Sequence, residues 1–443
     1  MLPGPYSRIY HYHLKKCGGS SLNRWLDTLT FDDRTFDPTW QTSWLLGDWQ
    51  TEMNLPGSAA EMATKRALFH WADVVHSHAA LRRFVPAGTL SFTILRDPVD
   101  RLASQITDFR RLVPADTVAE PDSIRGMIAD TGRLPMRALL ERYGHREGRM
   151  QLDNYITRSL AAGRIGRKVL RVENAETLLE TALDALENDY DLAGLLEEFD
   201  VSRNALCAIA GLPPARPIAT LNVSRPDSTD TAEIVDAEDI LRDLTRVDRI
   251  VYNRAQALFE DRHRAVGEAY GMADFERDHA ARLLSHLKGR HCNGATRYSV
   301  RSPLAGAGFH GRDCAGDPVC AVWTGPETAT TLYVPTPRDM QVSLLVWIRG
   351  YAAERQREQL RIKIDGRPAV HHLTPCDGYA DLLSADVCPA NDFVRLEIEL
   401  DETLDAMDSG CDSLDDRKRG LSFDSYGWRP LRPAGGSNGF AYL

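Results

Sequence analysis

The sequence contains no apolar run that approaches the ~18 residues needed for a membrane-spanning helix. Its first residues, MLPGPYSRIYHYHLKK, also show no apolar segment behind a basic one, so no secretory signal is visible and we expect a cytoplasmic protein. Pairs spaced Cys-x-x-Cys are missing among the eight cysteines, which argues against a zinc ribbon or a thioredoxin-like motif. The cysteines of the last third could form disulfides, but without a secretory signal we expect reduced thiols; they are Cys292, Cys314, Cys320, Cys376, Cys388 and Cys411.

An excess of positive charge is lacking as well. The 443 residues carry a net charge of −10, which argues against a protein that binds nucleic acid by neutralising phosphates. A local basic pocket in such a chain can still hold a small anion. With 43% hydrophobic and 26% charged residues, the composition is that of ordinary globular protein, and the length predicts two or three domains.

Residues 1–275 alternate between strand patterns and helix patterns, which is typical of a parallel sheet flanked by helices. Residues 175–211 and 234–270 have the apolar spacing of helices. Strands are expected at four β-prone runs, which are residues 8–14, 72–76, 90–95 and 168–172.

The pattern changes after residue 275. Residues 276–291 are charged and carry no strand signal, so we expect the end of a helix and a linker. Residues 292–443 contain short alternating runs separated by turn residues such as Asp365-Gly366, which predicts an all-β sandwich. Its clearest expected strands are residues 331–334, 341–348, 360–364 and 394–400.

A glycine-containing segment joins the first expected strand to an amphipathic helix. A strand–loop–helix junction of this kind turns free backbone N–H groups and the helix dipole toward an anion. It is not a Walker A loop, because its lysines precede the glycines. The alternative is a tight strand-to-helix turn with no ligand. The segment reads Lys15-Lys16-Cys17-Gly18-Gly19-Ser20-Ser21.

The third expected strand runs directly into Arg96-Asp97-Pro98. Asp97 suits the cap of a helix and Pro98 its first position. Arg96 can present a planar fork to a phosphate, and Ser104, about two turns into the helix, can add a hydroxyl. The alternative is a capped helix with a surface arginine and an incidental serine.

These two segments resemble motifs of the PAPS-dependent sulfotransferases, a family that includes the heparan sulfate 2-O-sulfotransferases and bacterial relatives (PAPS is 3′-phosphoadenosine-5′-phosphosulfate). HLKKCGGSSL, at residues 13–22, is similar to the family's 5′-phosphosulfate loop, with Lys15 and Cys17 in place of a proline and a threonine. TILRDPVDRLAS, at residues 93–104, is similar to its 3′-phosphate motif. Weaker similarity continues at residues 152–160, 221–226 and 248–259.

The resemblance implies a P-loop-like catalytic domain that uses PAPS as donor, releases PAP and needs no metal. The implied contacts to the donor come from Lys15, Lys16, Cys17, Gly18, Gly19, Ser20, Ser21, Arg96 and Ser104.

Sulfuryl transfer to a hydroxyl needs a base for the proton and positive groups for the leaving phosphate. His76 and His78 follow the second expected strand and point the same way if that strand continues. The resemblance implies that His78 is the base, that His76 orients the acceptor or shares the proton, and that Lys16 stabilises the bridging oxygen. Two alternatives for the histidine pair are zinc binding, although no carboxylate cluster is adjacent, and a structural role at the sheet edge.

Three further residues could belong to this region. His11 and His13 alternate in the first expected strand, where we expect core or surface roles. Glu173 could support the site or cap a helix.

The C-terminal region resembles the β-sandwich modules of bacterial glycosyltransferases. The similarity lies in GAGFHGRDCAGDPVCAVW at residues 306–323 and DRKRGLSF at residues 416–423. Aromatic side chains here could stack on sugars, although in a sandwich they more often belong to the core; they are Trp323, Trp347, Tyr351, Trp428 and Tyr442.

We therefore expect a sulfotransferase domain over residues 1–275, a linker over residues 276–291 and a β-sandwich over residues 292–443. The expected reaction is in-line sulfuryl transfer from PAPS to a hydroxyl of a carbohydrate acceptor, either a polysaccharide or a glycolipid. The alternative is a non-catalytic protein that binds a nucleotide or a glycan on the same fold. No feature of the sequence indicates an oligomeric state.

Overall fold

The computed structural model divides the chain into two compact units, each described by itself below. The N-terminal unit comprises Met1–Asn23, Asp33–Ala210 and Thr220–Gly271, and the C-terminal unit comprises Arg24–Asp32, Gly211–Ala219 and Met272–Leu443. No helix among the described residues is long and apolar enough to cross a membrane. The structure describes residues 6–29, 35–36, 67, 69–70, 72–78, 81–111, 122–145, 149–216, 228–285, 287–310, 312, 320–404 and 418–431.

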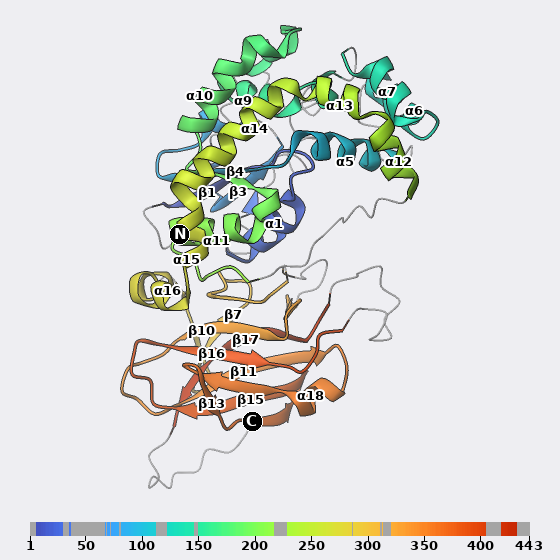
Figure 1. Ribbon diagram of the computed structural model, residues 1–443. Coiled ribbons are helices and arrows are strands. Elements are labelled where there is room, and N and C mark those ends of the chain that lie inside the picture. The colour runs from blue at the N-terminus through green and yellow to red at the C-terminus, as the bar shows by residue number, and fades with distance from the viewer. Residues whose placement is uncertain are drawn as a thin grey trace. The chain divides into compact units, whose positions relative to one another are not determined.

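A parallel sheet forms the centre of the N-terminal unit (Figure 1). Its strand order is β2-β3-β1-β4-β5, and every pairing in it is parallel. All seven residues of β4 are buried, as expected for a parallel strand covered on both faces. The strands are β1 (Arg8–Tyr12), β2 (Thr35–Phe36), β3 (Val74–Ser77), β4 (Thr89–Leu95) and β5 (Leu192–Leu195).

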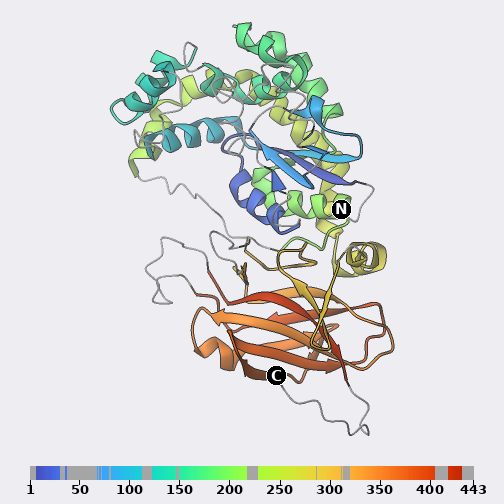
Figure 2. The ribbon, with the colours of Figure 1, turned by 180° about the vertical axis from the view of Figure 1, so that it is seen from behind.

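Helices cover both faces of this sheet, as Figures 1 and 2 show. Helix α1 (Gly19–Leu26) follows β1, and α5 (Pro98–Arg111) follows β4. The remaining α-helices of the unit are α6 (Asp122–Thr131), α7 (Met136–Tyr143), α8 (Arg149–Leu152), α9 (Tyr155–Ile165), α10 (Leu179–Asn188), α11 (Phe199–Ala210), α12 (Ser228–Asp236), α13 (Glu238–Leu244), α14 (Arg246–Phe259) and α15 (Ala265–Ala269). Shorter helical turns among its described residues are η2 (Arg82–Phe84), η4 (Gly166–Arg171), η5 (Ala175–Leu178), η6 (Leu196–Glu198) and η7 (Glu260–Arg264), whereas η1 (Asp27–Leu29) belongs to the C-terminal unit.

The expected strand at residues 168–172 is wrong. Residues 166–171 form the helical turn η4, and the carbonyls of Val172 and Glu173 accept hydrogen bonds from the Arg158 side chain at 2.7 and 2.8 Å. These acceptors are therefore occupied by a side chain instead of a neighbouring strand.

The fourth long parallel strand lies instead at β5, inside the stretch that was expected to be wholly helical. The backbone N–H of Asp191 donates to the Ser91 carbonyl at 2.7 Å, and the Asp191 carboxylate accepts from the Ser91 N–H at 2.8 Å. Asp191 thus fixes β5 beside β4. Periodicity alone does not distinguish a buried run of four residues from a helix segment.

The C-terminal unit contains two antiparallel sheets. One has the order β13-β12-β16-β10-β8, and the other follows the path β14-β15-β11-β17-β7-β6 with β9 paired to β17. A buried apolar cluster that includes Val334, Leu344, Val346 and Leu396 draws on both sheets, which is the architecture of a sandwich. The strands are β6 (Arg290–Cys292), β7 (Ala295–Ser299), β8 (Gly306–Ala307), β9 (Val322–Trp323), β10 (Ala329–Pro335), β11 (Val342–Tyr351), β12 (Arg361–Ile364), β13 (Arg367–Ala369), β14 (His372–Cys376), β15 (Tyr379–Val387), β16 (Phe393–Glu399) and β17 (Leu421–Pro430).

The four expected strands of this region correspond to β10, β11, β12 and β16. The predicted turn at Asp365-Gly366 joins β12 to β13, with φ angles of 51° and 80° at the two residues. Two left-handed residues are what a tight two-residue hairpin requires. Helix α18 (Arg355–Gln359) precedes β12.

Residues 276–291, expected to be a linker, are largely structured. They hold the end of α16 (Met272–Asp278), then α17 (Ala280–Leu284) and the start of β6. Phe275 of α16 packs edge-on against Tyr333 of β10 at 4.9 Å between ring centroids. These residues therefore belong to the body of the C-terminal unit.

The cysteines differ from the expectation of reduced thiols at one position. Cys320 forms a disulfide, and its partner lies outside the described residues, as do Cys314 and Cys411. The other described cysteines are free; they are Cys17, Cys207, Cys292, Cys376 and Cys388.

Candidate functional site

The loop after β1 is tightly constrained. Lys16 and Gly18 have φ angles of 65° and 77°, so the chain turns through two left-handed residues before α1 begins at Gly19. A Cβ atom on Gly19 would lie 1.9 Å from the His13 ring, so no larger residue fits while that ring holds its place. A left-handed lysine costs free energy and persists only where the surroundings impose it.

The loop leads into the start of α1, which is the candidate anion site. The first N–H groups of a helix have no partner within the helix, and its dipole favours negative charge there. Lys15 and Lys16 are half-buried, while Cys17 is fully buried and its thiol is held below the loop surface. Burial raises the pKa of the Cys17 thiol to about 12, so it is not a nucleophile at neutral pH. Ser21 is buried, and the side chain of Ser20 lies outside what the structure describes.

Helix α5 brings the second predicted segment to this loop. Arg96 Nη1 donates to the Lys16 carbonyl at 3.4 Å. The Asp97 carboxylate accepts from the N–H groups of Val99 and Asp100 at 2.9 and 3.3 Å, which confirms the predicted cap. Ser104 is half-buried on the same helix.

One face of α5 is turned to the loop. Arg101, Ser104 and Asp108 are spaced three and four residues apart, which places them on a single side of a helix. Asp108 Oδ1 lies 2.8 Å from Lys16 Nζ. The two segments that the sequence predicted as phosphate contacts are therefore neighbours in space.

The histidines gather at the ends of β1 and β3. His11 and His76 are register partners in the parallel pair, and the ring of His13 packs on that of His78 at 4.1 Å between centroids. His11 Nδ1 donates to Asn23 Oδ1 at 2.6 Å, and Asn23 Nδ2 donates to His13 Nδ1 at 3.2 Å. The sequence predicted core or surface roles for His11 and His13. Their i, i+2 spacing at a strand end, the same as that of His76 and His78, is the signal that could have placed them here.

The hydrogen bond of His78 fixes its tautomer. Nδ1 lies 2.6 Å from the carbonyl oxygen of His13. Because a carbonyl oxygen only accepts, Nδ1 carries the proton and Nε2 is the basic nitrogen of the neutral ring.

Burial favours the neutral form of three histidines of this cluster, His11, His13 and His78. The pKa of His78 is lowered to about 3, chiefly by burial and then by the charges of Lys15 and Lys16, against the hydrogen bond to His13, which raises it. Burial also lowers the pKa of His11 to about 3 and that of His13 well below its ordinary value. Within the described part of the chain, no three His, Cys, Asp or Glu side chains are grouped as they would be to hold a metal ion.

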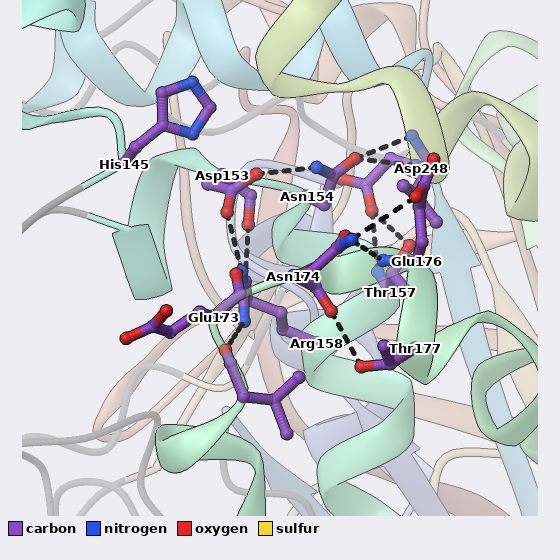
Figure 3. Close-up of polar contacts among 12 residues, drawn as sticks. His145, Asp153, Asn154, Thr157, Arg158, Glu173, Asn174, Glu176, Thr177 and Asp248 are labelled. Carbon is purple, nitrogen blue, oxygen red and sulfur yellow. Dashed lines mark hydrogen bonds and ion pairs between the residues drawn. The ribbon is translucent and has the colours of Figure 1, made fainter.

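Helices α9 and α14 cap each other reciprocally (Figure 3). The Asp248 carboxylate accepts from the N–H groups of Ile156 and Thr157 at 3.0 and 2.7 Å, at the start of α9. Asn154 Oδ1 accepts from the N–H groups of Val247 and Asp248 at 2.8 and 3.0 Å, at the start of α14. Each helix thus receives its cap from the other.

The remaining residues of this network are also structural. Arg158 forms an ion pair with Asp153 at 2.6 Å and is fully buried. The weakly similar segments at residues 152–160 and 248–259 therefore contribute to the scaffold, whereas residues 221–226 lie outside the described residues. Glu173 is exposed, and the helical turn that follows is capped by Asn174, whose side chain accepts from the Glu176 N–H at 2.9 Å.

The scaffold connects to the loop through Tyr155. Its hydroxyl accepts from the Lys15 N–H at 3.1 Å, and the Arg101 guanidinium lies 4.4 Å from its ring centroid. The first residue of α9 therefore sets the position of the loop backbone.

The aromatic residues of the C-terminal unit have protein partners. Arg297 lies over the Trp347 ring at 4.4 Å, and Arg419 lies over the Trp323 ring at 5.3 Å. The Tyr351 hydroxyl donates to Asp381 at 2.9 Å. Trp428 packs against the sandwich core, and Tyr442 lies outside the described residues.

Comparison with known proteins does not establish a family. No family model and no curated protein matches the chain. Among solved structures, a cycloisomaltooligosaccharide glucanotransferase from Paenibacillus sp. is similar over 96% of this chain and 57% of its own, with 10% identity and a TM-score of 0.21. A family GH115 4-O-methyl-α-glucuronidase with specificity for decorated arabinogalactans is similar over 75% of this chain and 42% of its own, with 10% identity and a TM-score of 0.19. The chain thus spans little more than half of these proteins at most, and the scores are too low to support an argument about fold or activity.

Proposed function

We propose that this protein is a sulfotransferase that moves a sulfuryl group from PAPS to a hydroxyl, on a P-loop-like N-terminal unit. The observation that carries the proposal is the meeting of Lys16, Arg96 and His78 around one loop at the carboxyl ends of β1, β3 and β4. In open α/β sheets this edge is where ligands bind. The two sequence segments that resemble the donor motifs are adjacent there.

The chemistry of the residues fits an anionic nucleotide donor. Four positive side chains lie on the loop, directly after β4 and on α5, and Asp108 forms an ion pair with one of them, Lys16; these side chains are those of Lys15, Lys16, Arg96 and Arg101. The free N–H groups at the start of α1 add donors for phosphate oxygens. In this assignment Lys16 and the loop hold the 5′-phosphosulfate, and Arg96 with Ser104 holds the 3′-phosphate.

In the proposed reaction the acceptor oxygen attacks sulfur and the bond between sulfur and the bridging phosphate oxygen breaks. The hydroxyl proton passes to Nε2 of His78, the nitrogen that its hydrogen bond to His13 leaves basic. Lys16 stabilises the charge that develops on the leaving PAP. His76 stands beside the base to orient the acceptor.

A pKa of about 3, which is lowered chiefly by burial, makes His78 a weak base in the ligand-free protein, and donor binding relieves the part of this shift that comes from nearby charges. The charges of Lys15 and Lys16 are among the causes that lower the pKa of His78. Phosphate and sulfate groups bound to these lysines neutralise those charges and raise the pKa toward the working pH. The base is therefore expected to gain strength when the donor is in place.

The carbohydrate nature of the acceptor rests on the resemblance to the 2-O-sulfotransferases. The second candidate function, a nucleotide- or glycan-binding protein without chemistry, shares the loop but requires no base. His78, with its fixed tautomer beside the loop, favours the enzyme.

Incubation of the protein with PAPS and a panel of polysaccharide, glycolipid and small hydroxyl acceptors tests the proposal. Mass spectrometry should show the sulfuryl increment on one acceptor class and stoichiometric release of PAP. Binding of PAP with no transfer to any acceptor would favour the non-catalytic alternative. Absence of PAP binding would contradict both the donor assignment and the proposal.

A further inference from the structure

Arg101 is a buried cation whose hydrogen bonds are incomplete. It lies on α5, and only 1% of its surface is exposed. Nη2 donates to the Gln151 carbonyl at 3.0 Å, but Nε and Nη1 are buried without a hydrogen-bond partner among the described residues. Buried arginines are normally fully bonded, because a desolvated charge with unmet donors is costly.

A second buried arginine of the same unit, Arg158, has a hydrogen-bond acceptor for each of its three side-chain nitrogen atoms. Arg158 is 0% exposed and pairs with the Asp153 carboxylate at 2.6 Å. Its Nε donates to the Asp153 carbonyl at 2.9 Å, and its other nitrogen atoms reach the carbonyls after η4. Arg158 therefore has a carboxylate and carbonyl oxygens around it, whereas Arg101 has one carbonyl and an aromatic ring.

The charge of Arg101 acts on the loop. The guanidinium lies over the ring of Tyr155, and the hydroxyl of that tyrosine binds the Lys15 N–H. The charge of Arg101 lowers the pKa of the Cys17 thiol, against a larger rise caused by burial. The charge of Arg101 therefore acts on Cys17, which lies two residues before the start of α1.

No carboxylate hydrogen-bonded to Arg101 balances this charge in the described structure. Asp248 stabilises the charged form of Arg101 electrostatically, but its own oxygens are bonded to Ile156 and Thr157 of α9. Burial is the largest influence on the guanidinium and lowers its pKa. Among the described residues, the charge of Arg101 is thus balanced only at a distance, by Asp248, and by no hydrogen-bonded anion.

We propose that Arg101 supplies the buried positive charge that a phosphate or sulfate group on the loop 15–21 neutralises. The arginine destabilises the ligand-free protein and contributes to affinity when the anion is bound. This inference rests on the anion-binding part of the proposed function and is independent of the transfer reaction. It separates Arg101 from Arg96, which the sequence assigns to direct contact with the donor.

The test compares wild type with Arg101→Met and Arg101→Lys in the full chain. Arg101→Met removes the charge and keeps a long apolar side chain over Tyr155. We expect its ligand-free melting temperature to equal that of wild type or to exceed it by up to about 5 °C, because an uncompensated buried charge is lost. We expect its Kd for PAP, measured by calorimetry, to rise at least tenfold, and that of Arg101→Lys to fall between the two.

The opposite pattern would overturn the inference. A melting temperature that falls by more than about 5 °C in Arg101→Met, a failure of that variant to fold, or an unchanged Kd would show that the guanidinium is structural. Arg158→Met is the matched control, because it leaves the buried Asp153 without its partner. That variant should lose stability strongly, as expected when one member of a buried ion pair is removed.

Pyrophosphate distinguishes this inference from the donor assignment. If wild type does not bind PAP, melting curves with millimolar pyrophosphate are compared with chloride at matched ionic strength. Stabilisation of wild type by pyrophosphate, reduced by half or more in Arg101→Met, supports the inference even though the donor assignment fails. If neither PAP nor pyrophosphate stabilises wild type, both the inference about Arg101 and the donor assignment are overturned.

Discussion

Lys16 Nζ lies 2.8 Å from Asp108 Oδ1, so the lysine proposed to stabilise the leaving phosphate is held by an acid when no ligand is bound. Asp108 belongs to the same helix face as Arg101 and Ser104. A donor phosphate that takes Lys16 must displace this carboxylate. Asp108 therefore competes with the donor phosphate for Lys16.

Asp108→Asn should strengthen PAP binding about two- to fivefold, which corresponds to the worth of a partly exposed ion pair. Titration calorimetry measures the effect. Asp184→Asn is the control, because Asp184 forms an ion pair of similar length with Arg164 elsewhere in the unit, at 3.2 Å. An affinity that is unchanged, or weakened, in Asp108→Asn would contradict the competition.

His78→Ala should keep donor affinity near that of wild type and lower turnover by ~10²–10⁴, the usual contribution of a general base. The matched change His76→Ala should lower turnover less and raise the KM for the acceptor. Steady-state kinetics with a small acceptor separate the two effects. Full turnover of His78→Ala across the pH range would place the base elsewhere.

The stability of the ligand-free protein should fall as the pH falls from about 6.5 to 5. The folded-state pKa values of His11, His13 and His78 lie below the unfolded value of about 6.5, so the unfolded chain binds more protons in this window. Their contribution is complete above the unfolded pKa and is lost as the pH drops below it.

Melting temperatures measured at pH 7, 6 and 5 check this dependence. The slope should decrease in His78→Gln. An equal slope in wild type and His78→Gln would show that this histidine is not buried as a neutral ring.

Asn154→Ala should destabilise the protein by about 2–4 kcal/mol, because two buried N–H groups of α14 lose their acceptor. Urea denaturation followed by circular dichroism measures the loss. Asn174→Ala removes an exposed cap of a helical turn and should cost about 1 kcal/mol or less. Similar losses in the two variants would contradict the importance of the reciprocal caps.

A fragment that ends at residue 275 should be poorly soluble. Arg24–Asp32 and Gly211–Ala219 belong to the C-terminal unit, where the Thr28 carbonyl accepts from the Leu304 N–H at 2.9 Å. The fragment would leave these segments without their partners. Recovery of a soluble fragment with a cooperative melting transition, in yields similar to the full chain, would contradict this expectation.

The sequence predicted the parts of the fold that depend on local patterns. The β-prone runs that became β1, β3 and β4 and the Asp97-Pro98 helix start could be recognised because each signal lies within a few residues. The strand β5 could not, because a run of four apolar residues between two helices has no period of its own. The false strand at residues 168–172 failed because Arg158 takes the carbonyls at its end.

The site could be predicted only at residues with a recognisable motif. Arg96 and Lys16 were found in that way, and the structure places them within 3.4 Å of each other through the Lys16 carbonyl. Asp108 and Asp248 could not be found, since their partners Lys16 and Ile156 each lie 92 residues away in the sequence. His13 had the right spacing, but its stacking on His78 depends on the register of two strands.

The reciprocal caps also determine how the unit opens. Neither α9 nor α14 can complete its first turn until the other is present, because each supplies the acceptor for the other's amides. Amide protons of Ile156, Thr157, Val247 and Asp248 should therefore exchange with solvent at one common rate, through a single concerted opening. Since Tyr155 starts α9 and its hydroxyl accepts from the Lys15 N–H, we expect that same opening to release the loop 15–21.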